Sequence, residues 1–406
     1  MPKTNFLLQK IAFLKEIFNE KFFKGEMIGA ILYLIFKPLL TFPKRKALKR
    51  QQLYSYKLLD RIRFRGKALL LSVAFHEFLL DFETWLGKSD SYKSKHRLHV
   101  RIDRSDTGDH YGKNIPALQK VYDTSKGYSK RSHVIECLLV SLGKKDYVLD
   151  FNILCEDEKG YTSTFLMLHE LLLRLGHHRD NFRRYCRLSL DGWYGKGKLF
   201  EYLQELGLTR SVLKSGGIDN VLYKNKEYTL TGLKKHLMNK GEYRDFNPCH
   251  GFENCDYKEC IVELMNKQIK LKAVLVRYHL KAPFQSRYLL LLSPNLEWWA
   301  YQIVQCYKAR WQIEVMFRTS KQVLELKKKS YHTKDANPEP AKLKKKQNKI
   351  ETHLALNLIG YMIINWCRIE CTRMSRTSLD DIKLSWMKLF EGYSPKALQC
   401  LFSSYG

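Results

Sequence analysis

The chain has 406 residues, and its 71 lysines and arginines against 41 acidic residues give a formal net charge of +30. A cation excess of this size is typical of proteins that meet polyphosphate, so we expect a nucleic-acid partner. The aromatic content of 13% excludes a disordered basic tail and favours a folded surface.

Cysteine usage and hydropathy indicate the compartment. The ten cysteines lie in apolar segments, and no secretory signal pattern opens the chain, which predicts reduced thiols in a cytoplasmic protein. The most apolar segment, residues 27–36, is ten residues long. A bilayer-spanning helix needs about 20 residues, so we expect no membrane segment.

The N-terminal region has helical periodicity. Apolar residues recur at helical spacing over residues 5–85, interrupted by glycine, proline and a basic turn that contains Lys44, Arg45 and Lys46. This pattern predicts an all-helical DNA-binding domain over residues 1–95, with the basic turn on phosphates. Solvated helix ends have the same composition.

Strand-like segments follow the N-terminal region. Residues 98–102, 132–141 and 146–154 read as three strands. A helix (164–175), a strand (185–190), a helix (198–206) and a strand (210–213) come next. Three antiparallel strands followed by alternating helix and strand is the order of a ribonuclease-H-like core, so we predict an α/β fold.

The rest of the chain divides by composition. We predict the first part of the core over 96–215, a largely β insertion over 216–287, the second part of the core over 288–371 and a tail over 372–406. One long helix is expected over 297–326, a basic loop over 327–346 and an apolar helix over 350–371.

The insertion contains a small cluster of metal-ligating residue types. Cys249, His250, Cys255 and Cys260 lie close in sequence but lack the paired C-x2-C spacing of zinc modules. The pattern favours local packing over a zinc site.

Acidic residues stand where predicted strands end. One strand runs into Asp103 and Asp106, and another ends at Asp191. These ends can lie side by side in a sheet, with the helix that carries Glu314 across them. Such a trio of carboxylates can hold two Mg2+ ions, which prefer oxygen ligands and promote phosphodiester chemistry.

The long predicted helix carries a stripe of four residues. Tyr307, Arg310, Glu314 and Lys321 stand at offsets 0, 3, 7 and 14, which places them within an arc of about 60° at ~100° per residue. Arg310 and Lys321 would neutralise phosphate charge, and Tyr307 would contact a sugar, base or phosphate. An ordinary amphipathic helix with a charged shoulder gives the same pattern.

The same four residues match the signature Tyr-x2-Arg-x3-Glu-x6-Lys without a gap. The chain therefore resembles the DDE transposases of bacterial insertion sequences, specifically the insertion-sequence-4 family. That family carries its first catalytic Asp directly before a Thr.

The resemblance implies the catalytic and metal-binding residues Asp106, Asp191 and Glu314. Asp106 precedes Thr107, and Asp191 opens an Asp-x-x-Tyr turn. Asp103 remains an alternative to Asp106. The resemblance also implies two Mg2+ ions, for which Mn2+ may substitute.

The implied activity is cut-and-paste transposition, with end nicking, hairpin formation and opening, and strand transfer into a target. Double-stranded DNA, as terminal inverted repeats and target, is the implied partner, and a homodimer is expected in the synaptic complex. Two alternatives stay open: another ribonuclease-H-like nuclease, and a DNA-binding regulator or inactive transposase relative.

Overall fold

The computed structural model describes residues 9, 12–14, 66–108, 117–123, 127–154, 160–192, 197–215, 220–239, 246–249, 255–265, 267–279, 286–322 and 339–372. The basic turn with Lys44, Arg45 and Lys46 lies outside the described residues. So do His250, most of the proposed N-terminal domain and nearly all of the tail.

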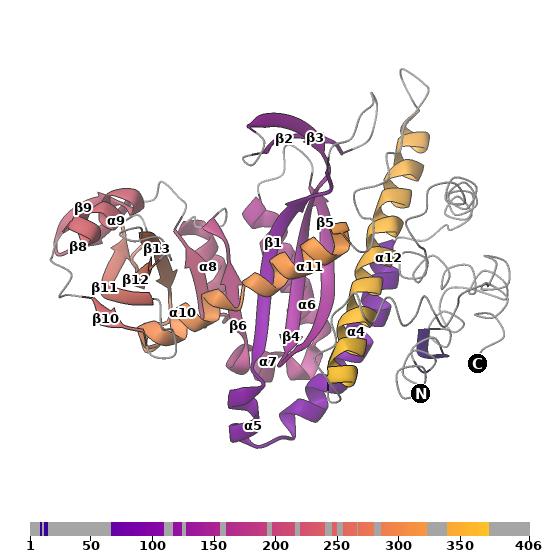
Figure 1. The fold of residues 1–406 in the computed structure, drawn as a ribbon, viewed down its shortest axis with the longest axis horizontal. Coiled ribbons are helices and arrows are strands. Elements are labelled where there is room, and N and C mark those ends of the chain that lie inside the picture. The colour runs from indigo at the N-terminus through magenta and orange to yellow at the C-terminus, as the bar shows by residue number, and fades with distance from the viewer. Residues whose placement is uncertain are drawn as a thin grey trace.

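The centre of the fold is a five-stranded mixed arrangement within a larger sheet (Figure 1). Strand β1 (Leu98–Asp106) pairs antiparallel with β4 (Val134–Leu142), which pairs antiparallel with β5 (Lys145–Leu154). On the other side of β1, β6 (Arg187–Leu190) and β7 (Ser211–Lys214) run parallel to it. This mixed α/β arrangement, in the order β5-β4-β1-β6-β7, is consistent with a ribonuclease-H-like core.

The insertion continues the same sheet. Strand β13 (Ser286–Ser293) pairs antiparallel with both β7 and β12 (Ile269–His279), and β12 pairs with β11 (Cys255–Leu264). The remaining strands at this edge are β8 (Asn220–Tyr223), β9 (Lys226–Thr229) and β10 (Asn247–Pro248). A separate hairpin of β2 (Gln119–Asp123) and β3 (Tyr128–Ser132), which the sequence did not predict, follows β1.

Helices lie beside the sheet and connect several of its strands (Figure 1). Their bounds are α4 (Gly66–Leu86), α5 (Asp90–Lys95), α6 (Gly160–Arg174), the short 3-10 helix η1 (Gly176–His178), α7 (Arg179–Tyr185), α8 (Gly197–Glu205), α9 (Leu230–Asn239), α10 (Ala300–Lys308), α11 (Trp311–Gln322) and α12 (Pro340–Thr372). None of these described helices is both long and apolar enough to cross a membrane.

Helices α4 and α12 lie side by side and complete the core next to β5. A side chain at Gly66, the first residue of α4, would lie 2.4 Å from the backbone of Thr352 on α12, so only glycine allows this approach. Further along α4, Phe78 stacks on Phe82 and meets the edge of Tyr147 from β5. All three aromatic side chains are fully buried.

The prediction of one helix over 297–326 is wrong in two respects. The helix begins at Ala300, because the Asn295 carboxamide accepts hydrogen bonds from the backbone of Glu297 and Trp298 in a turn. It also breaks at residues 309–310, where the Arg310 amide donates to the Tyr307 carbonyl at 2.9 Å in a tighter turn. The break separates α10 from α11, which crosses β1 (Figure 1).

The predicted basic loop is wrong over its last part. Residues 340–346 are the first turns of α12 and not a loop. Pro340 is the first helical residue, a position where proline is favoured because its missing N–H has no partner in a helix. Residues 327–338 lie outside the described part of the chain.

Candidate active site

Two carboxylates from distant parts of the chain bind one guanidinium. Arg310 donates from Nη1 to Asp103 Oδ2 at 2.5 Å and from Nη2 to Glu314 Oε1. Asp103 lies near the carboxyl end of β1 and is 8% exposed, whereas Glu314 is in the first turn of α11. The break before α11 places Arg310 and Glu314 over β1.

The third carboxylate lies beside this pair. Asp191 follows β6, the parallel neighbour of β1, and accepts a hydrogen bond from the Tyr307 hydroxyl at 3.4 Å. The Lys214 ammonium lies 3.6 Å from Asp191 Oδ1. Because β1 and β6 are parallel, their carboxyl ends share one edge of the sheet, which brings Asp103 and Asp191 to the same place.

The electrostatics of Asp103 and Arg310 reflect the burial and the charges around them. Burial raises the pKa of Asp103 to about 6, and the neighbouring charges of Asp191 and Glu314 add to this rise, although Arg310 opposes it. Burial alone would lower the pKa of Arg310, but the Asp103 carboxylate and its neighbours raise it well above its usual value. The guanidinium therefore stays charged.

Asp106 occupies a separate position three residues further along the strand. Its carboxylate lies 3.0 Å from the Lys130 ammonium of β3 and 3.7 Å from that of Lys321, and it accepts a hydrogen bond from the Gly108 amide. Burial tends to raise the pKa of Asp106, but these two lysines and the amide outweigh it, so the pKa is lowered.

The structure thus divides the predicted site residues into two groups. Asp191, Tyr307, Arg310 and Glu314 come together with Asp103. Asp106 and Lys321 form a flanking pair at the end of β1. Lys130 and Lys214 were not anticipated, because no motif marks them and the unpredicted β2–β3 hairpin brings Lys130 there.

The neighbouring tryptophans differ in their surroundings. Trp298 is buried under the guanidinium of Arg187, whereas Trp299 is 67% exposed. In the insertion, Cys249 and Cys255 lie in a hydrophobic cluster with the start of α10. This supports the packing interpretation of the two cysteines.

The trio of carboxylates fits divalent cations by its chemistry. Asp103, Asp191 and Glu314 offer oxygen donors, which Mg2+ and Mn2+ prefer. The guanidinium of Arg310 contacts two of the three carboxylates, Asp103 and Glu314, and offsets part of their negative charge. These residues would hold the metal ions that a DDE site uses.

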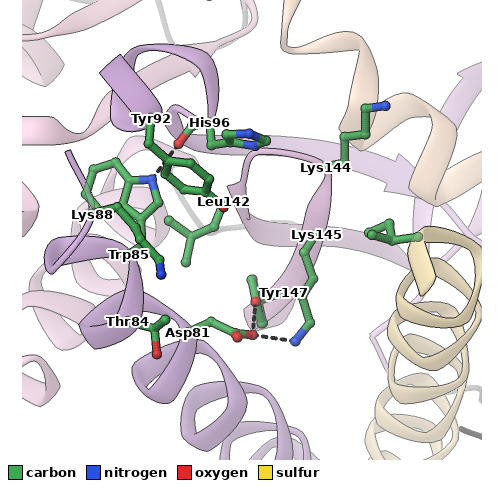
Figure 2. A pocket seen from close by; sticks show the side chains of 11 residues that line it. Asp81, Thr84, Trp85, Lys88, Tyr92, His96, Leu142, Lys144, Lys145 and Tyr147 are labelled. Atoms are coloured by element: carbon green, nitrogen blue, oxygen red, sulfur yellow. Dashed lines mark hydrogen bonds and ion pairs between the residues drawn. The ribbon is translucent and has the colours of Figure 1, made fainter. Parts of the chain in front are cut away.

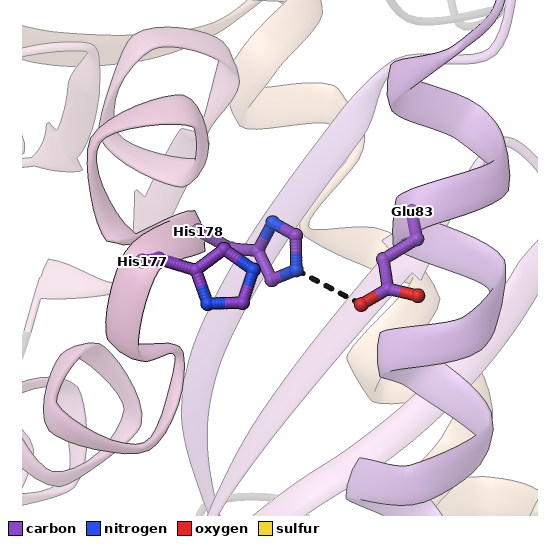
Figure 3. Close-up of side chains that lie close together, drawn as sticks. All are labelled: Glu83, His177 and His178. Carbon is purple, nitrogen blue, oxygen red and sulfur yellow. Dashed lines mark hydrogen bonds and ion pairs between the residues drawn. The ribbon is translucent and has the colours of Figure 1, made fainter.

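Two other features of the surface resemble binding sites. Glu83, His177 and His178 come together on the surface (Figure 3). The two imidazole centroids are 3.8 Å apart, whereas imidazoles that share a tetrahedral ion at about 2.1 Å keep centroids roughly 5 Å apart. We therefore assign no ion to this group.

A cavity of about 430 Å3 lies beside α4 (Figure 2). One of its lining lysines, Lys145, is paired with Asp81, which also accepts a hydrogen bond from the Tyr147 hydroxyl. Since the charge of Lys145 is already compensated, we assign this cavity no ligand.

The sheet order is consistent with the ribonuclease-H-like core of nucleases and transposases. A comparison with protein families identifies the family of the chain. Residues 106–339, more than half of the chain, match the family described as Transposase DDE domain. The chain belongs to this family.

The comparison with solved structures matches the chain to "Cryo-EM structure of piggyBac transposase synaptic complex with hairpin DNA (SNHP)". The identity is 15% and the TM-score 0.37, over 76% of this chain and 57% of the solved chain. The chain thus spans little more than half the length of that relative. No curated protein matches.

Proposed function

We propose that the chain catalyses cut-and-paste transposition of an insertion sequence of the insertion-sequence-4 type. The substrate is double-stranded DNA with the terminal inverted repeats of the element, and a second DNA is the target. The observation that supports this most is the contact of Asp103, Arg310 and Glu314 beside Asp191.

In this proposal Asp103, Asp191 and Glu314 are the catalytic carboxylates that hold two Mg2+ ions. The bound ions supply activation of the attacking water or 3′-hydroxyl and charge stabilisation at the leaving oxygen. Asp106, the residue favoured by the sequence signature, is the alternative first ligand. Its two lysine partners instead suit a role beside the DNA backbone.

Arg310 has a double role in this proposal. Without substrate its guanidinium pairs with both Asp103 and Glu314 and offsets part of their negative charge. When the DNA phosphate and metal ions enter, the same planar donor group turns to the phosphate, where its geometry suits bidentate contacts. Tyr307 holds Asp191 through its hydroxyl, and Lys321 with Lys130 contacts the backbone near the cleaved end.

The later steps follow from the same site. The freed 3′-hydroxyl attacks the opposite strand to form a hairpin, water opens the hairpin, and the 3′-end joins the target. Each step breaks one P–O bond and forms another, so one set of carboxylates serves all of them. Synapsis of two ends requires a homodimer.

The test is cleavage of a DNA fragment that carries the ends flanking this gene, with Mg2+, Mn2+ or EDTA. Glu314→Ala and Asp191→Ala should abolish nicking at the element boundary and retain binding in a band-shift assay. Glu297→Ala, an exposed acid on the turn before α10, is the matched control and should cleave normally. Binding without cleavage by the unmodified protein would instead indicate a DNA-binding regulator or an inactive relative.

A further inference from the structure

A second charged site lies at the opposite end of the central strands. A cavity of about 320 Å3 is enclosed by α5, the end of α7 and the starts of β1 and β6. Five cationic side chains line it: Lys93, Arg97, Arg184, Arg187 and Arg210. The lining contains one carboxylate, Asp90, whose side chain is 94% exposed and 4.0 Å from Lys93.

The topology explains why the arginines meet there. Arg97 directly precedes β1, Arg187 is the first residue of β6 and Arg210 directly precedes β7. Because these three strands are parallel neighbours, their amino ends share one edge of the sheet. The carboxyl ends of β1 and β6, which Asp103 and Asp191 adjoin, lie at the other edge. Strand β1 ends on the side of the β2–β3 hairpin (Figure 1).

The partners of these arginines are neutral groups. Arg97 donates to the Ser94 carbonyl at 2.8 Å and to the side chain of Gln305 on α10. Arg210 donates to the Arg184 carbonyl. Among the described residues, the buried Arg187 Nη1 has no hydrogen-bond partner, and neither has the nearby His99 Nδ1.

Among the described residues that line this cavity, five cations face one carboxylate, the exposed Asp90. Burial lowers the pKa of Arg187 to about 10, and the cations of Arg97 and Arg210 contribute to the fall. Burial also lowers the pKa of His99 well below its usual value, with Arg101, Arg187 and Arg97 adding to it. A buried donor and repelling cations cost free energy that an incoming anion would recover.

Some of the cations that line this cavity also contact aromatic rings. Arg184 lies over Tyr185, Arg187 lies over Trp298, and Lys93 lies near both Trp85 and Tyr185. Such contacts stabilise the faces of the cations. They leave the in-plane N–H donors of the guanidinium groups available, and these donors are the groups that bind phosphate oxygens.

We propose that this cavity binds a backbone phosphate of the DNA substrate, remote from the cleaved phosphodiester. The proposal rests on the proposed function. Six residues of extended strand separate Arg97 from Asp103, which at about 3.3 Å per residue is about 20 Å. At about 3.4 Å per base pair, the contacted phosphate lies roughly six base pairs from the cleavage point.

The test compares Arg187→Gln with Arg174→Gln, a substitution of equal charge at a residue paired with Glu170 on α6. Affinity for the element-end duplex is measured in EDTA over a series of KCl concentrations, so neither metal nor catalysis is needed. Loss of one phosphate contact lowers the slope of log affinity against log salt by about 0.9. We expect this change, with a several-fold loss of affinity, for Arg187→Gln and an unchanged slope for Arg174→Gln.

Phosphate-ethylation interference should locate the affected phosphate. Interference about six base pairs from the cleavage point is expected with the unmodified protein and should be lost in Arg187→Gln. An unchanged salt slope would overturn the proposal, while metal-dependent cleavage by the same preparation would leave the proposed function intact.

A thermal melt without DNA separates binding from a structural role. Removal of an uncompensated cation should leave the melting temperature of Arg187→Gln unchanged or higher. If the melting temperature of Arg187→Gln falls, the salt dependence of DNA affinity is measured for Arg184→Gln instead. An unchanged salt slope in an Arg184→Gln protein of normal stability would also overturn the proposal. A different result would assign the cavity to free phosphate. In that case inorganic phosphate would raise the melting temperature of the unmodified protein but not of Arg187→Gln, and the two proteins would have equal salt slopes of DNA affinity.

Discussion

At the scale of single residues, the candidate site depends on Arg310. One guanidinium holds two carboxylates that a metal ion would otherwise bring together. The arginine offsets part of their charge, and metal ions bound as proposed would compete with it for the same oxygens. Its position in the signature therefore has a physical reason besides phosphate contact.

Arg310→Ala tests this competition. The variant should bind Mn2+ several-fold more tightly, because Asp103 and Glu314 lose their internal cation, and should cleave DNA more slowly because the phosphate loses its guanidinium. Mn2+ affinity is measured by electron paramagnetic resonance titration, with Lys308→Ala on the neighbouring α10 as control. Weaker Mn2+ binding by Arg310→Ala would argue against the competition.

His99 should make stability depend on pH. Its pKa is depressed in the folded chain, so below about 6.5 the unfolded chain takes up a proton that the folded chain does not. The unfolding free energy then falls as the pH falls, by about 1.4 kcal/mol per unit from this residue. Urea denaturation at pH 7, 6 and 5 should show a shallower loss for His99→Gln, and parallel profiles would refute the assignment.

At the scale of elements, a buried polar network fixes the break between α10 and α11. Arg101, two residues before Asp103 on β1, donates to the Ala309 carbonyl at the break and to Ser141 on β4. Ser141 donates to Asp146 of β5, which also accepts from Gln312 of α11 at 2.7 Å. The strand that carries one carboxylate is thus tied to the helix that carries another.

Asp146→Asn should therefore be strongly destabilising. Asp146 is the buried acid of this network whose charge acts on the buried Arg101. The change to asparagine removes that negative charge. A loss of ~3 kcal/mol in unfolding free energy is expected, because removing a nearby opposite charge from a buried cation is costly. Asp180→Asn, at an exposed acid on α7, should change stability by less than about 0.5 kcal/mol; equal effects in chemical denaturation would contradict the account.

The packing of α4 on α12 gives a second prediction at this scale. Gly66→Ala places a methyl group 2.4 Å from the Thr352 Cα, so the helices must separate. Overpacking of this kind costs about 1–3 kcal/mol. At Gly87 the nearest atom would be 3.6 Å away, so Gly87→Ala is the control. Thermal melts of the two variants should differ clearly, and similar melts would show that α4 shifts without cost.

At the scale of the whole molecule, the order of the core strands along the chain was largely predictable from sequence. The strands that end near Asp106 and Asp191 could be recognised in the sequence, because their apolar runs stop at turns with acidic residues. The family signature identified Glu314. The choice between Asp103 and Asp106 was not predictable. It depends on which side chain meets Arg310 across a helix break, and tertiary contacts from Arg101 help to fix that break.

The cationic cavity was equally beyond sequence analysis. Its arginines lie 90 and 23 residues apart in the chain, from Arg97 to Arg187 and from Arg187 to Arg210, and only the pairing of parallel strands brings them together. Together the two sites extend along β1, with carboxylates at one end and arginines at the other. A DNA duplex along this line would contact both.

The most direct measurement is single-turnover cleavage of the element end in Mg2+ by Asp103→Ala and Asp106→Ala, with DNA binding measured in EDTA on the same preparations. Asp103→Ala should lose nicking by several orders of magnitude and keep its affinity, because it removes a metal ligand. Asp106→Ala should retain metal-dependent nicking at a reduced rate. Abolished cleavage in Asp106→Ala with near-normal cleavage in Asp103→Ala would contradict the assignment of the first carboxylate.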